Sequence, residues 1–164
     1  MNNQTQQHHH LKDPGSAITH FIGMLMAIFA ATPLLIRACS HREPVYVISM
    51  TVFIVSMILL YAASTIYHSF DISERANRIL RKIDHMMIFV LIAGSYTPVC
   101  LLVLKGRTGT MLCALVWAIA IIGILVKAFW ITCPKWFSSI IYIAMGWVCV
   151  LVFGPLLNTL STPA

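Results

Sequence analysis

Charged residues are scarce in this 164-residue chain. Asp, Glu, Lys and Arg make up only 10% of it, five residues are acidic, and 59% are hydrophobic. Soluble domains contain about 25% charged and roughly 45–50% apolar residues. A single soluble domain of this length cannot bury so much apolar surface, so lipid must surround much of the chain. The composition therefore excludes an ordinary soluble fold and makes the lipid bilayer the expected partner.

The chain also lacks the signatures of a disulfide scaffold, a cysteine metal cluster and a cleaved signal peptide. Its cysteines are odd in number and form no CxxC pair. Four of them lie in or beside apolar runs, which is typical of membrane packing. No basic segment leads directly into an apolar core at the N-terminus, so we expect no signal peptide. The five cysteines are Cys39, Cys100, Cys113, Cys133 and Cys149.

The first 16 residues are polar and include His8, His9 and His10. These histidines could bind a metal, but their polar neighbours provide no scaffold for a site. We therefore interpret residues 1–16 as a polar cytoplasmic tail and residues 17–160 as one transmembrane domain.

Five long apolar runs dominate the rest of the chain. Each is close to the ~20 residues that a helix needs to cross a ~30 Å hydrocarbon core. Lipid requires each segment to satisfy its own backbone hydrogen bonds, which favours helices. The sequence predicts an all-α, polytopic transmembrane helix bundle with about five spans, near Ile18–Ile36, Val45–Tyr67, Met86–Leu104, Thr110–Phe129 and Phe137–Leu157.

Prolines and glycines support these boundaries. Pro44 opens the second run and Pro134 precedes the fifth, while Gly106 and Gly109 flank the turn before the fourth. Pro98 falls inside the third run and is expected to distort it.

The basic residues lie between the apolar runs, as loop charges do in membrane proteins, and do not form a nucleic-acid site. One side of the predicted bundle collects seven Lys and Arg residues and the other collects four. The positive-inside rule then places the N-terminus in the cytoplasm, with the chain in the cell (inner) membrane. The seven are Lys12, Arg75, Arg78, Arg81, Lys82, Lys127 and Lys135, and most belong to the predicted loop Ser69–Lys82.

Strongly polar groups occur at three places at the ends of the runs, and such groups are functional candidates because they are costly in a membrane. His20 lies near the start of the first helix, Ser64 and His68 lie four residues apart at the end of the second, and Asp84 and His85 open the third. All three places are expected at the cytoplasmic surface, so these side chains could converge on one pocket. Imidazoles, a carboxylate and a water are groups that suit Zn²⁺.

Each residue also has a structural interpretation. A histidine at a helix end often interacts only with free carbonyls, and Asp84 could be a helix-start charge favoured by the dipole. Ser64 could bond its own helix backbone. The spacing alone leaves these alternatives open.

Five segments resemble the haemolysin III family, the bacterial branch of the progestin and adipoQ receptor superfamily. The resemblance covers nearly the whole chain from about Asp13, and the Ser-x-x-x-His pattern followed by Asp is its most specific part. The segments are Ala17–Gly23, Leu60–His68, Arg81–His85, Ile92–Pro98 and Tyr142–Trp147.

The resemblance implies a seven-helix fold with the N-terminus inside, of which this chain provides the first five helices. It implies that His68 is a metal ligand for Zn²⁺, that Asp84 holds the zinc-bound water, and that Ser64 lies in the same pocket. Some relatives resemble zinc-dependent membrane hydrolases that cleave lipid amides. The chain would then be related to such enzymes and act on a lipid substrate.

The sequence departs from the family pattern in two places. Asp13 and Ser16 stand near the positions where the family usually has Glu and Asn. The His-x-x-x-His pair of the family's last helix is absent, so the chain is expected to be C-terminally truncated, with an incomplete active site. His20 and His85 are weaker candidates for the missing metal ligands. The alternatives are a cytolytic, pore-forming haemolysin, a non-enzymatic regulator of membrane homeostasis, and an inactive fragment.

Overall fold

The computed structural model describes residues 11–130, 135–151 and 154, and within these ranges every regular element is a helix. The three tail histidines, Cys133, Pro134 and most of the predicted fifth run beyond Leu151 lie outside the described residues. The helices are α1 (Pro14–Cys39), α2 (Pro44–Ser69), α3 (Glu74–Pro98), α4 (Gly106–Phe129) and α5 (Lys135–Leu151), with a π-helical segment, η1 (Val99–Leu104), between α3 and α4.

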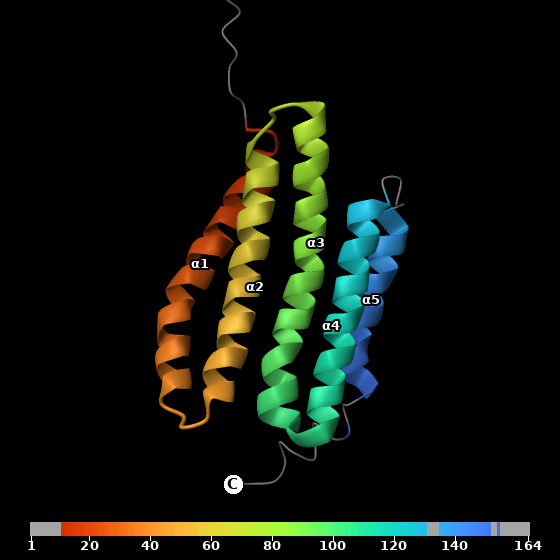
Figure 1. The fold of residues 1–164 in the computed structure, drawn as a ribbon. Helices are drawn as coiled ribbons and strands as arrows, with labels where there is room; N and C mark the ends of the chain where they lie inside the picture. Colours follow the sequence, from red (N-terminus) through yellow and green to blue (C-terminus); the bar gives the residue numbers. More distant parts are fainter. Residues whose placement is uncertain (1–10, 131–134, 152–153, 155–164) are drawn as a thin grey trace, which may run out of the picture.

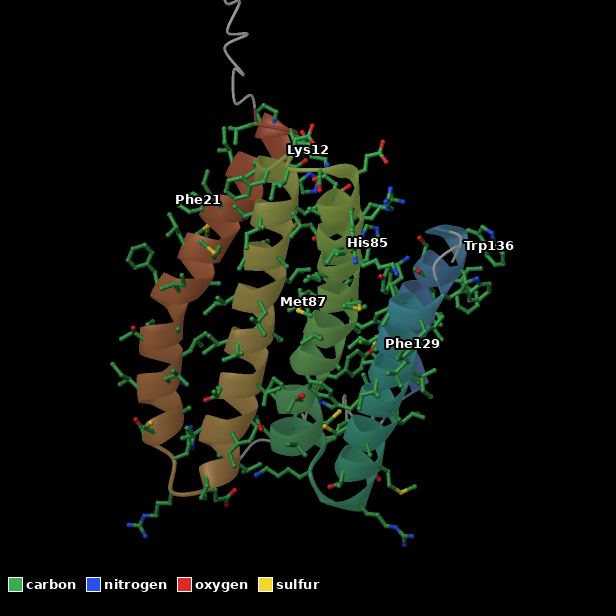
Figure 2. All side chains as sticks on the ribbon, turned by 45° about the horizontal axis from the view of Figure 1, so that its top comes forward. Lys12, Phe21, His85, Met87, Phe129 and Trp136 are labelled. Atoms are coloured by element: carbon green, nitrogen blue, oxygen red, sulfur yellow. The ribbon has the colours of Figure 1, made fainter. Side chains whose placement is uncertain are left out.

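Four of these helices are long and apolar enough to cross a membrane. They are Pro14–Cys39, Pro44–Ser69, Glu74–Leu104 and Gly106–Phe129, while Trp136–Val150 is a shorter apolar helix within the described part of the chain. Large apolar side chains such as Phe21 and Phe129 point away from the bundle (Figure 2), and Phe129 is 81% exposed. In water this exposure would be costly, but lipid is an adequate solvent for it. The predicted polytopic helical membrane bundle is therefore confirmed.

α3 occupies the centre of the bundle. It packs against α2 on one side and against α4 and α5 on the other, and α1 packs against α2 (Figure 1). The α2–α3 connection and the start of α1 lie at the same end of the bundle, together with the end of α4. The polar residues predicted at the ends of the first three helices are therefore at one end.

The boundary between α2 and α3 differs from the sequence prediction. The segment Ser69–Lys82, predicted as a charged loop, is mostly the first part of α3, which begins at Glu74. Ser73 accepts a hydrogen bond from the backbone N–H of Ala76 at 3.2 Å, and Glu74 places a negative charge in the first turn. Asp84 does not open the helix but lies about three turns into it. The interpretation of Asp84 as a helix-start charge is therefore wrong, because the dipole effect fades within the first turn.

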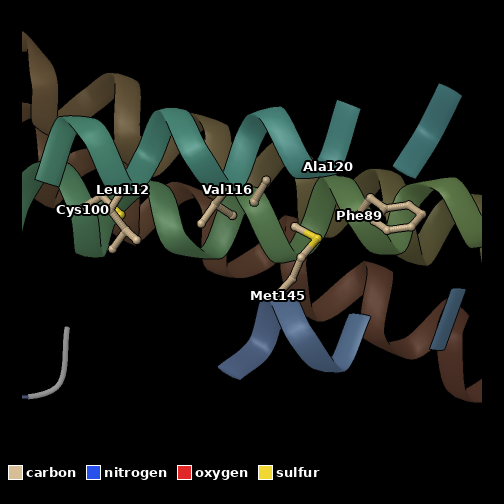
Figure 3. Close-up of a cluster of buried hydrophobic side chains, with 7 residues drawn as sticks. Phe89, Cys100, Leu112, Val116, Ala120 and Met145 are labelled. Atoms are coloured by element: carbon tan, nitrogen blue, oxygen red, sulfur yellow. The ribbon is translucent and has the colours of Figure 1, made fainter. Parts of the chain in front are cut away.

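The apolar core lies between α3, α4 and α5. Its fully buried members include Phe89 and Ala93 of α3, Val116 and Ala120 of α4, and Met145 of α5 (Figure 3). Polar side chains at the edge of this cluster join the helices: the Trp117 indole N–H donates to Thr97 Oγ1 at 3.1 Å, and the Tyr96 hydroxyl bonds the α5 backbone. Interhelical hydrogen bonds of this kind stabilise association where apolar burial alone offers little.

Small residues set the distance between neighbouring helices. A Cβ atom added at Gly94 of α3 would lie 2.1 Å from Ser56 Oγ and 2.7 Å from Ser56 Cβ in α2. Gly23 of α1 similarly faces the ring of Tyr61, and Ala27, one turn further along α1, is buried. The small-residue spacing predicted on the first helix thus serves packing within the bundle.

α3 changes geometry after Pro98. Proline lacks a backbone N–H and cannot continue the α-helical ladder. The chain continues as the wider η1 segment, in which the Lys105 N–H donates to the Cys100 carbonyl five residues earlier at 3.1 Å. Lys105 and Gly106 then adopt positive φ values of 47° and 57°, and α4 begins at Gly106, before the predicted Thr110. Gly109, predicted to flank the turn, lies inside α4.

The Gly94–Ser56 contact gives a test of the helix packing. Gly94→Ala is expected to destabilise the bundle by about 1–3 kcal/mol, because the Ser56 Cβ cannot move without shifting α2. Thermal unfolding of the detergent-solubilised chain measures the change. Gly146→Ala is the matched control, since nothing lies within 4 Å of a Cβ there. Adding Ser56→Gly to Gly94→Ala should restore stability, and a Gly94→Ala midpoint equal to that of Gly146→Ala would contradict the packing.

Candidate polar site at one end of the bundle

His20 and Ser64 join α1 to α2 near the end where both helices meet the α2–α3 connection. Their Nδ1 and Oγ atoms are 2.5 Å apart. The His20 ring also packs edge-on against His68, with ring centroids 5.7 Å apart, and against Tyr61 at 6.0 Å. His20 lies about two turns into α1, so its ring contacts the last turns of α2 from within the bundle.

His68 is held by the segment that precedes α1. Its Nδ1 lies 3.2 Å from Oδ2 of Asp13, and its carbonyl accepts a hydrogen bond from the Asp13 backbone N–H at 3.0 Å. Because Nδ1 faces the carboxylate, Nε2 is the ring atom left for a ligand. The sequence had only the family departure at Asp13 as a signal, and it did not predict this contact.

The Asp13 carboxylate is itself positioned by a hydrogen bond. The Ser16 hydroxyl donates to Asp13 Oδ2 at 2.7 Å. This bond, with a smaller contribution from His68, lowers the pKa of Asp13 below its ordinary value of 3.8. The carboxylate is therefore ionised at neutral pH and available to His68.

Asp84 reaches the same place from α3. It is 8% exposed, and it lines a cavity of about 230 Å³ together with His20, Ser64 and His68. Leu60, Tyr61 and Ile88 complete the lining. A buried carboxylate is costly without partners, and among the described residues its one ion-pair neighbour is the His85 ring, with Nδ1 3.5 Å away. The structure thus brings four of the five predicted site residues to one cavity.

His85 lies apart from this cavity. Its Nδ1 bonds the Arg81 carbonyl in the preceding turn at 2.8 Å, and its own carbonyl accepts from the Tyr142 hydroxyl of α5 at 2.7 Å. Its side chain lines a second, larger pocket on the side of α3 that faces α4 (Figure 2). Consecutive residues of a helix are rotated by about 100°, which explains why Asp84 and His85 face different helices.

The donor types around the small cavity suit zinc, but the set is incomplete. Within residues 11–130 and the described part of α5, no three His, Cys, Asp or Glu side chains are grouped closely enough to hold a metal ion. The cavity therefore provides part of a metal site, with His68 as its best-oriented donor.

Comparison with known proteins identifies the family. The family model described as "Haemolysin-III related" matches residues 8–164. The chain belongs to the haemolysin III family. It is 42% identical over 146 residues to a Hemolysin-3 homolog of Bacillus subtilis (strain 168), covering 89% of this chain and 68% of the relative. It is 39% identical over 146 residues to Hemolysin-3 of Bacillus cereus, covering 89% and 66% respectively.

This haemolysin III chain therefore spans about two thirds of the length of these curated relatives. No solved structure matches it. The family resemblance predicted from the polar motifs is confirmed, and it now has a geometric counterpart in the cavity between α1, α2 and α3.

The Ser16–Asp13 hydrogen bond predicts a pKa change. Ser16→Ala should raise the pKa of Asp13 toward 3.8, because the carboxylate loses its main donor. A carboxyl with a depressed pKa contributes stability above its unfolded pKa and loses it as the pH falls through the folded value, so the Asp13–His68 contact should weaken at higher pH in the variant than in the parent. Carboxyl ¹³C NMR titration in micelles measures the shift.

Ser40→Ala is the control for that titration, because the Ser40 hydroxyl bonds the Ile36 carbonyl at the far end of α1. An Asp13 titration that is the same in Ser16→Ala and in the parent would contradict the assigned role of the hydroxyl.

Proposed function

We propose that this haemolysin III protein is related to zinc-dependent membrane hydrolases that cleave lipid amides, with its site in the cavity between α1, α2 and α3. The contact between Asp13 and His68 carries the proposal. Metal-binding histidines usually donate their second ring N–H to a carboxylate, which fixes the ring and raises its basicity. His68 has this arrangement, and a buried carboxylate, Asp84, lines the same cavity.

His68 is the proposed zinc ligand, with Nε2 as its donor atom. His20 is a weaker candidate, since its Nδ1 is used by Ser64. The remaining ligands would come from outside the described residues, because those residues do not form a complete set. Zinc bound there would lower the pKa of a water to about 7 and polarise the substrate carbonyl.

Asp84 is the proposed general base. Its carboxylate accepts a proton from water as the water oxygen bonds to the amide carbonyl carbon. The C–N bond then breaks and the same proton passes to the leaving nitrogen, which gives a carboxylic acid and an amine. The burial of Asp84 supports this role, because desolvation raises the proton affinity of a carboxylate. Ser64 holds His20 at the cavity wall and offers its hydroxyl to the substrate.

The distribution of cations supports a cytoplasmic location for this end of the bundle and a location of the chain in the inner membrane. Lys12, Arg75, Arg78, Arg81, Lys82 and Lys127 all lie near the cavity end. Positive charge on short connections favours the cytoplasmic side. The lipid substrate would then enter from the inner leaflet.

Zinc binding tests the proposal directly. Zinc titration against a chromogenic chelator should show one weak site per detergent-solubilised chain. His68→Ala should lower its affinity by at least about tenfold, because the oriented ligand is lost. His85→Ala is the matched control and should leave the affinity unchanged, since His85 lines the other pocket. His8, His9 and His10 are replaced by Gln in every sample, because a run of histidines can bind zinc by itself.

Hydrolysis of a fluorogenic lipid amide by the same samples separates the ligand from the base. Asp84→Asn should keep the zinc and lower the rate by about a hundredfold or more. A parent that binds no zinc, or equal losses in His68→Ala and His85→Ala, would refute the metal site. A zinc-loaded parent without hydrolysis would refute the enzymatic part alone.

The names of the relatives support a second candidate, lysis of membranes. Hemolysin-3 of Bacillus cereus carries that activity in its name. The core between α3, α4 and α5 is apolar and closely packed, whereas a pore needs a continuous polar face. We expect no dye release from liposomes at high protein load, and leakage that rises with protein concentration would favour the pore.

A further inference from the structure

A second pocket, of about 790 Å³, lies at the same end of the bundle, on the other side of α3. Its lining includes six cationic side chains and no Asp or Glu among the described residues. The six come from three parts of the chain: Lys12 before α1, Arg75, Arg78, Arg81 and Lys82 in the first turns of α3, and Lys127 in the last turn of α4. The fold therefore concentrates positive charge around one concave surface.

The cations of this pocket are mostly without acidic partners in the described structure. Only Arg78 forms an ion pair, with Glu74, and both of those side chains are largely exposed. The carboxylates nearest in sequence are engaged elsewhere: Asp71 accepts from Asn77 and Asp13 contacts His68. Several positive charges thus face the pocket without neutralisation by the described part of the chain.

Lys127 distinguishes this pocket from an ordinary row of topology-determining charges. It is only 9% exposed, and its Nζ donates to Ser138 Oγ of α5 at 2.8 Å. Burying an ammonium group without an anion is costly, and in membrane proteins such groups mark sites of function. A serine hydroxyl offers hydrogen bonding but no negative charge, so an anion from outside the described residues would complete the site.

The position of the pocket indicates where that anion comes from. Trp130, at the end of α4, and Ile79 of α3 also line it, and both are about half exposed. Tryptophan at the end of a span is typical of the headgroup level of a bilayer. The pocket thus places cations beside apolar walls at the depth where lipid phosphates lie, and basic pockets between helices are known to bind anionic headgroups.

We propose that this larger pocket binds the phosphate of an anionic phospholipid headgroup, with Lys127 and Arg81 as its main contacts. The site is separate from the cavity of His68 and Asp84, and its ligand is a bound lipid with no chemical step assigned to it. Phosphate is the shared chemistry of a lipid headgroup and a soluble phosphate, and the apolar wall of Ile79 and Trp130 favours the lipid.

Native mass spectrometry of the detergent-solubilised chain tests the proposal, with cardiolipin and phosphatidylcholine as probes. Cardiolipin should bind at least about tenfold more tightly than phosphatidylcholine. The double variant Arg81→Gln with Lys127→Gln should lose about tenfold or more of the cardiolipin affinity. Arg42→Gln with Arg107→Gln removes the same charge outside the pocket and should change the affinity by less than about twofold.

Further arms keep the test decisive. Arg75→Gln with Arg81→Gln changes only exposed side chains, so it should weaken cardiolipin binding even if Lys127→Gln disturbs the contact with α5. Asp84→Asn should leave cardiolipin binding unchanged, which separates this site from the proposed hydrolytic one. Equal losses in the pocket and control variants would overturn the site. Displacement of cardiolipin by millimolar inorganic phosphate would overturn the lipid assignment in favour of a soluble phosphate.

Discussion

The close approach of α2 and α3 at Ser56 and Gly94 is the constraint on which the rest of the structure depends. Lipid tails are as apolar as the helices, so burial of apolar surface provides little force for association in a bilayer. Helices instead associate where small residues let backbones come close and polar groups can bond. Gly94 allows this for α3, and the resulting register brings Asp84, about three turns earlier, to the cavity that Ser64 and His68 line.

α3 divides the polar end of the bundle into two environments of opposite character. On the α1–α2 side, imidazoles, a hydroxyl and a buried carboxylate surround a small cavity. On the α4 side, Lys and Arg surround a pocket more than three times larger. One helix produces both, because Asp84 follows Arg81 by three residues and precedes His85 by one. The rotation per residue alone separates a site suited to proton transfer from one suited to anions.

Much of this arrangement could be predicted from the sequence. The apolar runs fixed the helical membrane class, and the polar motifs at the ends of three runs located the cavity and the family. The start of α3 was missed because the segment Glu74–Lys82 is charged, and charge in a membrane protein reads as loop, whereas Ser73 caps a helix there. His85 was grouped with Asp84 because sequence neighbours were treated as spatial neighbours.

Two contacts had no sequence signal strong enough to predict them. Asp13 meets His68 because the segment before α1 folds back over the last turn of α2, and such a return depends on backbone geometry that hydropathy does not encode. Lys127 meets Ser138 because α5 packs on α4. Both contacts join residues that a one-dimensional pattern assigns to different categories, a tail to a helix and a loop charge to an apolar run.

The hydrogen bond between His20 and Ser64 also has a consequence in time. The two residues are 44 positions apart, so α1 is synthesised completely before its partner exists. At roughly 5–20 residues per second, the wait is roughly 2 to 9 seconds. During that interval the imidazole of α1 must be solvated by water or by lipid headgroups. A nascent α1 therefore settles at the membrane surface before it is drawn into place, and α1 and α2 assemble as one hairpin.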